Sequence, residues 1–475
     1  MVQPLCQLIS VSILQSARQP WRGCRTPSRT TAVYQRTASR QTHDDYGVVV
    51  RSGLPDVPVN VAGIDSEMTK PKAVMSFLHT QIWQRLPRGL RRSALFAATA
   101  RAAPKPSPDA RPAHPVIVVG ALRTASGLGQ SARLCYDALD QAGIPVMGID
   151  VTRLLGEVED MPDYPFRDGS ACVGAGTLIV HVNAPTFPLA MFSLGQKLIE
   201  HKYVVGCWAW ELPDAPPDWK HGVPFVHEIW TPSAFTAASI APIAGNRPVP
   251  VVPYSIALGQ HPKPRAPRQA GTPFTVVTIF NVASSFARKN PCAAIQAFRL
   301  AFGDAADAHL IVKIANTQAF PKSRALIEKA AGNAPNITII DRTFNALEIA
   351  LLYAQADALI SLHRSEGFGL TIAEAMLYGI PTVATGWSGN VDFLTPQTGI
   401  SVPYTLIPAT DPQGGYQYPG MNWAQPDIPA AAAGLRYLYE HPVEATRLGE
   451  SAARFAHAAW SPALYVETVR RQLGL

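Results

Sequence analysis

The stretch Ser365-Glu366-Gly367-Phe368-Gly369-Leu370-Thr371-Ile372-Ala373-Glu374 lies between two apolar segments and decides the fold of this chain. Residues 356–362 before it predict a buried strand, and residues 381–384 after it predict a second, shorter strand. We expect a helix over residues 370–378, because Gly379 suits the left-handed residue that follows a helix and Pro381 cannot continue one. Strand, loop, helix and strand in this order indicate a parallel α/β sheet.

The loop at residues 365–369 is expected at the carboxyl edge of that sheet, where open α/β proteins bind their ligands. Gly367 and Gly369 allow backbone N–H groups to approach an anion, and the start of the helix at Leu370 adds partial positive charge. A diphosphate suits such a place. Glu366 is able to accept hydrogen bonds from sugar hydroxyls, and Glu374 from the two hydroxyls of a ribose. The structural alternatives are a solvated loop acid at 366 and a helix-capping acid at 374.

The segment 366–374 resembles the donor-binding motif of the retaining glycosyltransferases of family four, in which two glutamates are separated by seven residues. The resemblance continues through Ala375-Met376, residues 379–385 and Gly389-Asn390. It implies the GT-B fold, an α/β architecture of two Rossmann-like domains facing a cleft. It also implies that a sugar moves from a nucleoside-diphosphate sugar to a glycan or lipid-linked oligosaccharide acceptor, with retention of configuration. The residues that it implies for donor binding are Arg288, Lys289, Gly367, Phe368, Gly369, Leu370 and Glu374, with Glu366 positioning the transferred sugar.

Arg288 and Lys289 form a cationic pair between a predicted strand at 274–280 and a predicted helix at 291–302. Such a pair is able to hold a diphosphate, Arg through a fork of donors and Lys as a point charge. Lys289 matches the family's lysine, although Asn290 stands where a glycine usually follows. The family's arginine commonly lies six residues earlier, at Ala283 here, so we expect Arg288 to supply the missing charge from another direction.

The first folded domain is predicted to begin with a strand at 116–120 and a helix at 130–141. Gly127 comes seven positions after Gly120, which argues against a dinucleotide fingerprint, because that fingerprint has its first glycine directly after the strand. In the family, a glycine loop at this position lies in the interdomain cleft. His181 ends a strand at 177–183, where it is either structural or the acceptor-side histidine of some family members. The tryptophans near 208–213 either fill the core or cover sugar faces. Residues 206–213 and 228–235 resemble bacterial polysaccharide-assembly members of the family. With this resemblance, His181 joins Glu366 as a catalytic candidate. The acceptor-side candidates are Gly127, Gly129, Asn183 and Glu211.

The chain has 475 residues with 47% hydrophobic content, enough for two or three domains. We expect an extension at 1–112, an acceptor-side domain at 113–258, a donor-binding domain at 259–456 and, at 457–475, a helix that crosses back to the first domain as in similar proteins. The formal charge is +7, but residues 1–111 hold 16 of the basic and 6 of the acidic residues, so the remainder is slightly acidic. The folded part therefore lacks the basic face expected of a nucleic-acid-binding protein.

The extension differs from the rest of the chain in composition. Residues 16–43 are rich in Arg, Ser, Thr and Gln and nearly without acids, which predicts disorder, with a transit peptide as the alternative. Translation is expected to begin at Met68 or Met75. Residues 76–101 form a basic amphipathic segment that either lies on an anionic membrane surface or packs on its own domain.

Other sequence features limit the chemistry and the compartment. No apolar run reaches about 18 residues, and the six cysteines show no paired or metal-ligand spacing. We therefore expect a cytoplasmic protein, with peripheral association at the inner face of the membrane as an option. No Asp-x-Asp sequence occurs, so we expect a metal-independent enzyme with no cofactor besides its donor substrate. Two other functions stay open, a sugar-nucleotide epimerase of the same fold and a non-catalytic glycan-binding protein.

Overall fold

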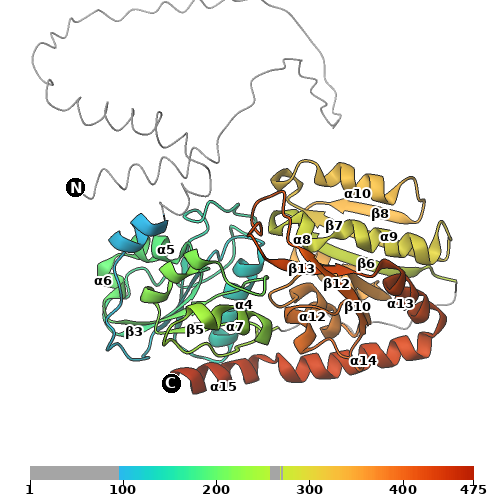
Figure 1. Ribbon diagram of the computed structural model, residues 1–475. Helices are drawn as coiled ribbons and strands as arrows, with labels where there is room; N and C mark the ends of the chain where they lie inside the picture. The colour runs from blue at the N-terminus through green and yellow to red at the C-terminus, as the bar shows by residue number, and fades with distance from the viewer. Residues whose placement is uncertain (1–95, 257–267, 269–270) are drawn as a thin grey trace, which may run out of the picture. The chain divides into compact units, whose positions relative to one another are not determined.

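The computed structural model describes residues 96–256, 268 and 271–475 of the chain (Figure 1). The expectations for residues 16–43, for the start sites Met68 and Met75 and for most of the amphipathic segment 76–101 lie outside the described residues. Residues 96–102 are helical, with Phe96 and Thr99 buried and Ala103 in the core of the first domain. This end of the amphipathic segment thus packs on its own domain.

The first domain contains a parallel five-stranded sheet with the order β2-β1-β3-β4-β5. Its central strands are buried on both faces, as their continuous apolar sequences predict. The strands are β1 (Val116–Gly120), β2 (Val146–Asp150), β3 (Gly176–His181), β4 (Lys202–Cys207) and β5 (Glu228–Trp230). The helices are α4 (Gly127–Gln141), α5 (Phe187–Leu194), α6 (Gln196–Ile199) and α7 (Ala234–Ile240), with the 3-10 turns η3 (Pro217–His221), η4 (Val223–Phe225) and η5 (Ala241–Ile243).

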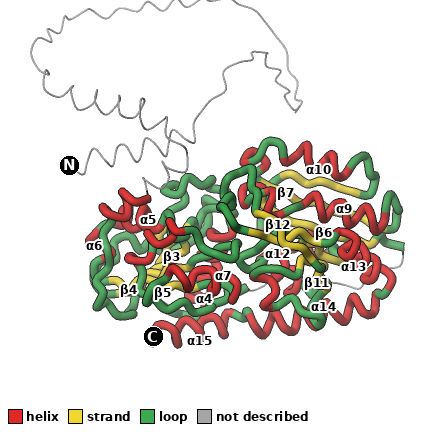
Figure 2. The backbone as a smooth tube through the Cα atoms, viewed as in Figure 1, coloured by secondary structure: helices red, strands yellow, loops and turns green. Residues whose placement is uncertain are grey.

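The second domain contains a parallel six-stranded sheet with the order β11-β10-β9-β6-β7-β8. Its strands are β6 (Phe274–Asn281), β7 (Ala308–Ala315), β8 (Ile337–Asp341), β9 (Ala358–Ser361), β10 (Thr382–Thr385) and β11 (Ile400–Val402). The helices are α8 (Phe286–Lys289), α9 (Pro291–Phe302), α10 (Ser323–Ala331), α11 (Ala346–Ala354), α12 (Leu370–Leu377), α13 (Ile428–Glu440) and α14 (Pro442–Ala459), with the 3-10 turns η6 (Val282–Ser284), η7 (Thr317–Ala319) and η8 (Gly389–Asp392). In both domains helices surround the strands (Figure 2), so the predicted fold class is confirmed.

Two segments of the second half of the chain pack on the first domain. The hairpin β12 (Tyr404–Pro408) and β13 (Asn422–Pro426) contributes Trp423 to the core around β3 and β4. The last helix, α15 (Pro462–Leu473), contributes Tyr465 and Val469 to the core around β1 and α4. Over the described residues, none of the helices combines the length and the hydropathy that a membrane span requires.

One helix start and one helix cap differ from the sequence expectation. Helix α4 begins at Gly127, because the side chain of Ser126 caps it and accepts a hydrogen bond from the Gly129 backbone N–H at 3.2 Å. Gly127 and Gly129 thus form the first helical turn rather than a loop. Helix α12 begins at Leu370, as expected, but has Gly369 as its N-cap, with φ of 101° and no side-chain cap, so the alternative of a capping role for Glu374 is wrong.

Candidate functional site

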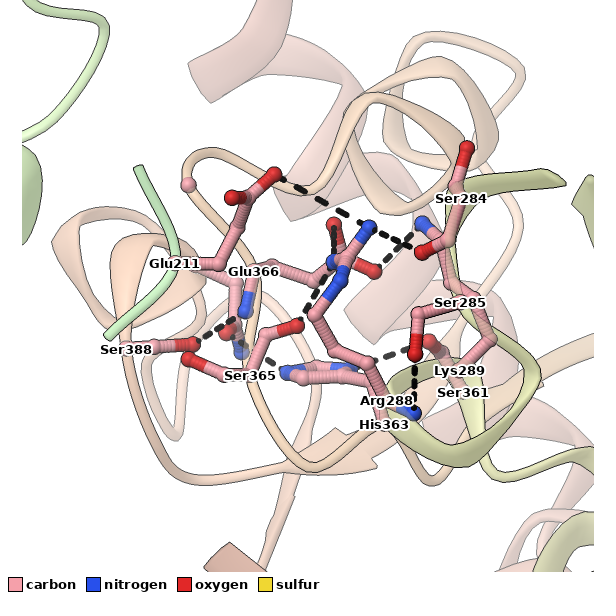
Figure 3. Close-up of polar contacts among 12 residues, drawn as sticks. Glu211, Ser284, Ser285, Arg288, Lys289, Ser361, His363, Ser365, Glu366 and Ser388 are labelled. Carbon is pink, nitrogen blue, oxygen red and sulfur yellow. Dashed lines mark hydrogen bonds and ion pairs between the residues drawn. The ribbon is translucent and has the colours of Figure 1, made fainter. Parts of the chain in front are cut away.

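Four charged side chains converge from three segments at the carboxyl ends of strands (Figure 3). Arg288 and Lys289 lie on α8, which follows β6, while Glu366 follows β9 and Glu211 follows β4 of the other domain. The sequence fixes α8 at both ends. Ser285, at φ 74°, caps its start, and Asn290 in the left-handed conformation ends it before Pro291 opens α9.

Glu366 is the common partner of both cations. Its Oε1 lies 2.5 Å from Lys289 Nζ and its Oε2 lies 3.2 Å from Arg288 Nη1, while its side chain is only 10% exposed. Burial opposes ionisation, but the charges of Lys289 and Arg288 outweigh it and lower the pKa of Glu366 to about 2. Burial lowers the pKa of Lys289. Glu366 is therefore an anion at neutral pH and is suited to accept hydrogen bonds rather than to donate a proton.

The guanidinium of Arg288 is held in its plane by backbone carbonyls. Nη1 donates to the Ser365 carbonyl at 2.8 Å and Nη2 donates to the Ser284 carbonyl at 2.8 Å, and the side chain is 3% exposed. The position of the family's arginine, Ala283, lies in η6 just before α8. Arg288 thus brings a positive charge to Glu366 from α8, as expected, while its part in ligand binding stays a prediction.

Glu211, an acceptor-side candidate by sequence, lies in the same charged cluster. Its Oε1 is 3.8 Å from Arg288 Nη2, and its Oε2 accepts a hydrogen bond from the Tyr416 hydroxyl at 2.9 Å. Burial raises the pKa of Glu211. The side chain therefore joins the first domain to the cation pair of the second.

The backbone of the loop 366–369 is held from both domains. The Glu366 N–H donates to Ser388 Oγ at 2.7 Å, and the Glu366 carbonyl accepts from the Gly389 N–H at 2.8 Å. From the first domain, Ser233 Oγ donates to the Gly367 carbonyl at 2.6 Å. A Cβ at Gly389 would lie 2.3 Å from that same carbonyl oxygen, so only glycine fits there.

Phe368 and Leu370, the two remaining donor-binding candidates of this stretch, have different surroundings. Phe368 is buried among the rings of Tyr254, Phe393 and Trp460, at centroid distances from 5.0 to 5.6 Å. Its side chain thus belongs to the core. Leu370 is the first residue of α12, so this eight-residue helix begins directly after the loop that carries Glu366.

Glu374 lies one turn into α12 and is paired with a tyrosine. Its Oε2 accepts a hydrogen bond from the Tyr353 hydroxyl at 3.0 Å, and the ring of Tyr353 stacks on that of Tyr378 at 5.1 Å. Burial raises the pKa of Glu374 to about 7. Gly369 caps the helix, so Glu374 has no capping role. Since the bond to Tyr353 uses Oε2, the other carboxylate oxygen, Oε1, is able to bind a further partner.

The first-domain candidates lie at the carboxyl ends of β1 and β3. His181 is 2% exposed, its Nδ1 is 2.9 Å from Ser131 Oγ, and burial lowers its pKa to about 3, which keeps the ring neutral. Its buried Nε2 has no hydrogen-bond partner among the described residues. Asn183 Oδ1 accepts from the Ala209 N–H at 2.9 Å, so this amide joins two strand ends. A Cβ at Gly129 would approach the Thr124 carbonyl to 2.5 Å, whereas Gly127 faces open space.

Two residues near the charged cluster, His363 and Tyr416, were not among the candidates predicted from the sequence. His363 is fully buried, with Nε2 3.0 Å from Asn390 Oδ1 and Nδ1 3.1 Å from Ser361 Oγ. Burial lowers the pKa of His363. Its place directly after the strand that precedes Glu366 is a signal that could have found it. Tyr416, between β12 and β13, has no comparable local pattern.

Two cavities lie apart from the charged cluster. One of about 790 Å³ follows the end of β2 and is lined among others by Arg123, Asp150 and Tyr164. Another of about 220 Å³ lies between α4 and the C-terminal residues, with Leu139, Val469 and Leu475 in its wall. In the described part of the chain, no group of three or more His, Cys, Asp or Glu side chains is arranged to hold a metal ion.

Comparison with known proteins gives one family match, over residues 237–424, to the model described as Family 4 Glycosyltransferase in conflict systems. No curated protein matches the sequence. Among solved structures, HepE (Alr3699) of Anabaena in complex with UDP and glucose is 13% identical, with a TM-score of 0.52 over 76% of this chain and 99% of its own. Sucrose-phosphate synthase of Thermosynechococcus elongatus is 15% identical, with the same TM-score and coverage.

S. aureus TarM is 14% identical, with a TM-score of 0.48 over 63% of this chain, and this chain spans only 55% of TarM's length. HepE and sucrose-phosphate synthase are 13% and 15% identical to this chain, and at these identities the matches show a shared fold. The family match includes α8, the loop 366–369 and α12, and therefore Arg288, Lys289 and Glu366 of the charged cluster, but not Glu211. Residues 237–424 thus resemble family 4 glycosyltransferases, and the chain as a whole shares its fold with HepE and sucrose-phosphate synthase.

Proposed function

We propose that the protein transfers a sugar from a nucleoside-diphosphate sugar to a glycan or lipid-linked oligosaccharide acceptor, with retention of configuration, in polysaccharide assembly. The observation that carries the proposal is the convergence of Arg288 and Lys289 on Glu366 beside the N-terminus of α12. Cations and helix-terminal N–H groups in such an arrangement are able to bind a diphosphate. HepE was solved with UDP and glucose, which supports UDP as the first nucleotide to test.

The proposed chemistry divides the work between the charged residues. Lys289, Arg288 and the N–H groups at the start of α12 stabilise the negative charge that develops on the leaving diphosphate, and no metal takes part. Glu366, which is ionised at neutral pH, shares the cations with the diphosphate and accepts hydrogen bonds from the hydroxyls of the transferred sugar. Phe368 supports this loop from the core rather than touching the donor.

The acceptor is proposed to enter from the first domain. The unpartnered Nε2 of His181 lies at the carboxyl end of β3 and is able to bond an acceptor hydroxyl while the imidazole stays neutral. Gly127 and Gly129 would shape that side through the start of α4, and Asn183 through the end of β3. A cytoplasmic location, with an anionic membrane surface as a partner of residues 76–101, belongs to the same proposal.

A thermal-shift panel with UDP, GDP, ADP and CMP tests the donor site. We expect one of the diphosphates to raise the melting temperature, UDP first among them, because a ligand that binds only the folded state stabilises it by mass action. A shift of several degrees at a concentration about a hundred times Kd is the expected size for a chain of this length. Stabilisation by none of the four would contradict the transferase proposal and would favour a glycan-binding protein.

The affinity for the nucleotide is also expected to depend on pH through Glu374. Because its pKa is raised to about 7, the carboxyl is neutral below that pH and gains a second accepting oxygen for the ribose hydroxyls above it. Affinity should therefore rise by about tenfold between pH 6 and pH 8. Titration calorimetry measures it, and Glu374→Gln is the control, because the nucleotide's own phosphate titrates equally in both proteins. Equal pH dependence in the two proteins would remove Glu374 from the site.

A further inference from the structure

The segment between β12 and β13, residues 409–421, packs beside the charged cluster. It belongs to the second domain by chain order, but Tyr416, Tyr418 and Met421 pack against the core of the first domain. The rings of Trp210 and Tyr416 stack at 5.4 Å with an interplanar angle of 26°. This segment therefore lies where the two domains meet, next to the cation pair.

Asp411 holds the segment in place from within. It is fully buried, and its Oδ1 accepts hydrogen bonds from Ser285 Oγ at 3.0 Å and from the Gln413 N–H at 3.1 Å. Its Oδ2 accepts from the N–H groups of Gly415 at 2.8 Å and Tyr416 at 3.2 Å. Because Ser285 caps α8, the carboxylate ties the position of Tyr416 to the helix that carries both cations.

Gln413 adds a second connection to the same helix. Its Oε1 accepts from the Phe286 N–H at 2.6 Å, and its Nε2 donates to the Val282 carbonyl at 3.0 Å. Val282 lies in η6 and Phe286 is the first residue of α8. Gln413 thus forms hydrogen bonds with η6 and with the first residue of α8, the helix that carries Arg288 and Lys289. The bonded residues are more than 120 positions apart in the sequence.

Tyr416 contacts the charged cluster through both its ring and its hydroxyl. The guanidinium carbon of Arg288 lies 5.1 Å from the ring centroid, a cation–π distance. The hydroxyl donates to Glu211 Oε2 at 2.9 Å. Carbonyls of Ser284 and Ser365 fix Arg288 in its plane, and the ring of Tyr416 covers one of its faces. Tyr416 thus adds a contact outside the plane in which the two carbonyls bind the guanidinium.

We propose that Tyr416 is a positioning residue for the donor, holding Arg288 and Glu211 so that the guanidinium meets the second phosphate of the nucleoside diphosphate. The inference rests on the proposed function, since it concerns the same donor site. It assigns a role to the segment 409–421, which the donor-binding motif does not include. Tyr416 acts through Arg288, so its effect is confined to ligands that carry the second phosphate.

The test compares the affinities for UDP and UMP by titration calorimetry, with the full chain. The preference for UDP over UMP reports the contact with the second phosphate, and it does not depend on the fraction of folded protein. We expect Tyr416→Phe, which loses only the bond to Glu211, to lower this preference by about threefold, and Tyr416→Leu, which also loses the ring over Arg288, by about tenfold. Affinity for UMP should stay unchanged in both.

Two further proteins complete the test. Tyr404→Phe alters an exposed tyrosine of β12 in the same hairpin and should keep the wild-type preference. In an Arg288→Met background, Tyr416→Leu should cause no additional loss, because residues that act through one another are not additive. If both Tyr416 variants keep the wild-type preference for UDP over UMP, Tyr416 only fills space. That result overturns the positioning role of Tyr416 and leaves the donor site standing. If the wild type binds neither nucleotide, the donor site itself is overturned and the inference with it.

Discussion

Replacing Glu366 with Gln is expected to abolish sugar transfer and at the same time to tighten the binding of UDP. In the wild type, Glu366 neutralises Lys289 and Arg288 with contacts of 2.5 and 3.2 Å in a nearly water-free setting. A neutral amide leaves Lys289 without its anionic partner and leaves Arg288 with only the more distant Glu211, at 3.8 Å, so the negative charge of a diphosphate is attracted more strongly. Transfer should fall by at least about 100-fold, because the sugar loses the anion that orients it.

The same substitution should destabilise the free protein. Removing one partner of a buried ion pair costs about 3–5 kcal/mol in the free energy of unfolding. UDP should recover part of this loss, so the thermal shift that it causes should be larger in Glu366→Gln than in the wild type. Glu450→Gln, which alters an acid whose side chain is 65% exposed, is the matched control. Wild-type turnover in Glu366→Gln, or weaker UDP binding, would contradict the role assigned to Glu366.

Replacing Lys289 with Met should have the opposite effect on the nucleotide. Met keeps the length of the side chain and removes its charge, so the diphosphate loses a charged hydrogen-bond donor. Affinity for UDP should fall by about 10- to 100-fold. The protein should stay folded, because Glu366 keeps Arg288 at 3.2 Å. Lys329→Met, on the exposed face of α10, controls for the loss of one positive charge. Unchanged affinity for UDP would show that Lys289 serves only as a structural partner of Glu366.

Elements marked by local chemistry could be predicted from the sequence. Pro291 and Gly303 bound α9, and β1 appears as the apolar run 116–120, both at the predicted residues. Helix α12 was predicted to within one residue at its end. Its start at Leu370 was predicted as well, but the capping role offered as an alternative for Glu374 was wrong, because Gly369 caps the helix through its backbone conformation and leaves no side-chain signal.

The composition of the charged cluster could be predicted only in part. Arg288, Lys289 and Glu366 lie in motifs that the sequence displays, and the structure brings their side chains together. Glu211 was assigned to the acceptor side, because a position at a strand end does not reveal which loop of the other domain it meets. Tyr416 meets Glu211 from 205 residues away, and such a pairing depends on how the two domains pack.

The most direct test of the central claim, that this charged cluster is a nucleotide-sugar donor site, is one series of calorimetric UDP titrations against three proteins. The donor-site assignment predicts a single UDP site per chain, with affinity decreasing in the order Glu366→Gln, wild type, Lys289→Met. The order follows from the charge that each protein presents to the diphosphate at the positions of Lys289 and Arg288. Equal affinity for UDP in all three proteins, or no binding in any of them, would contradict it.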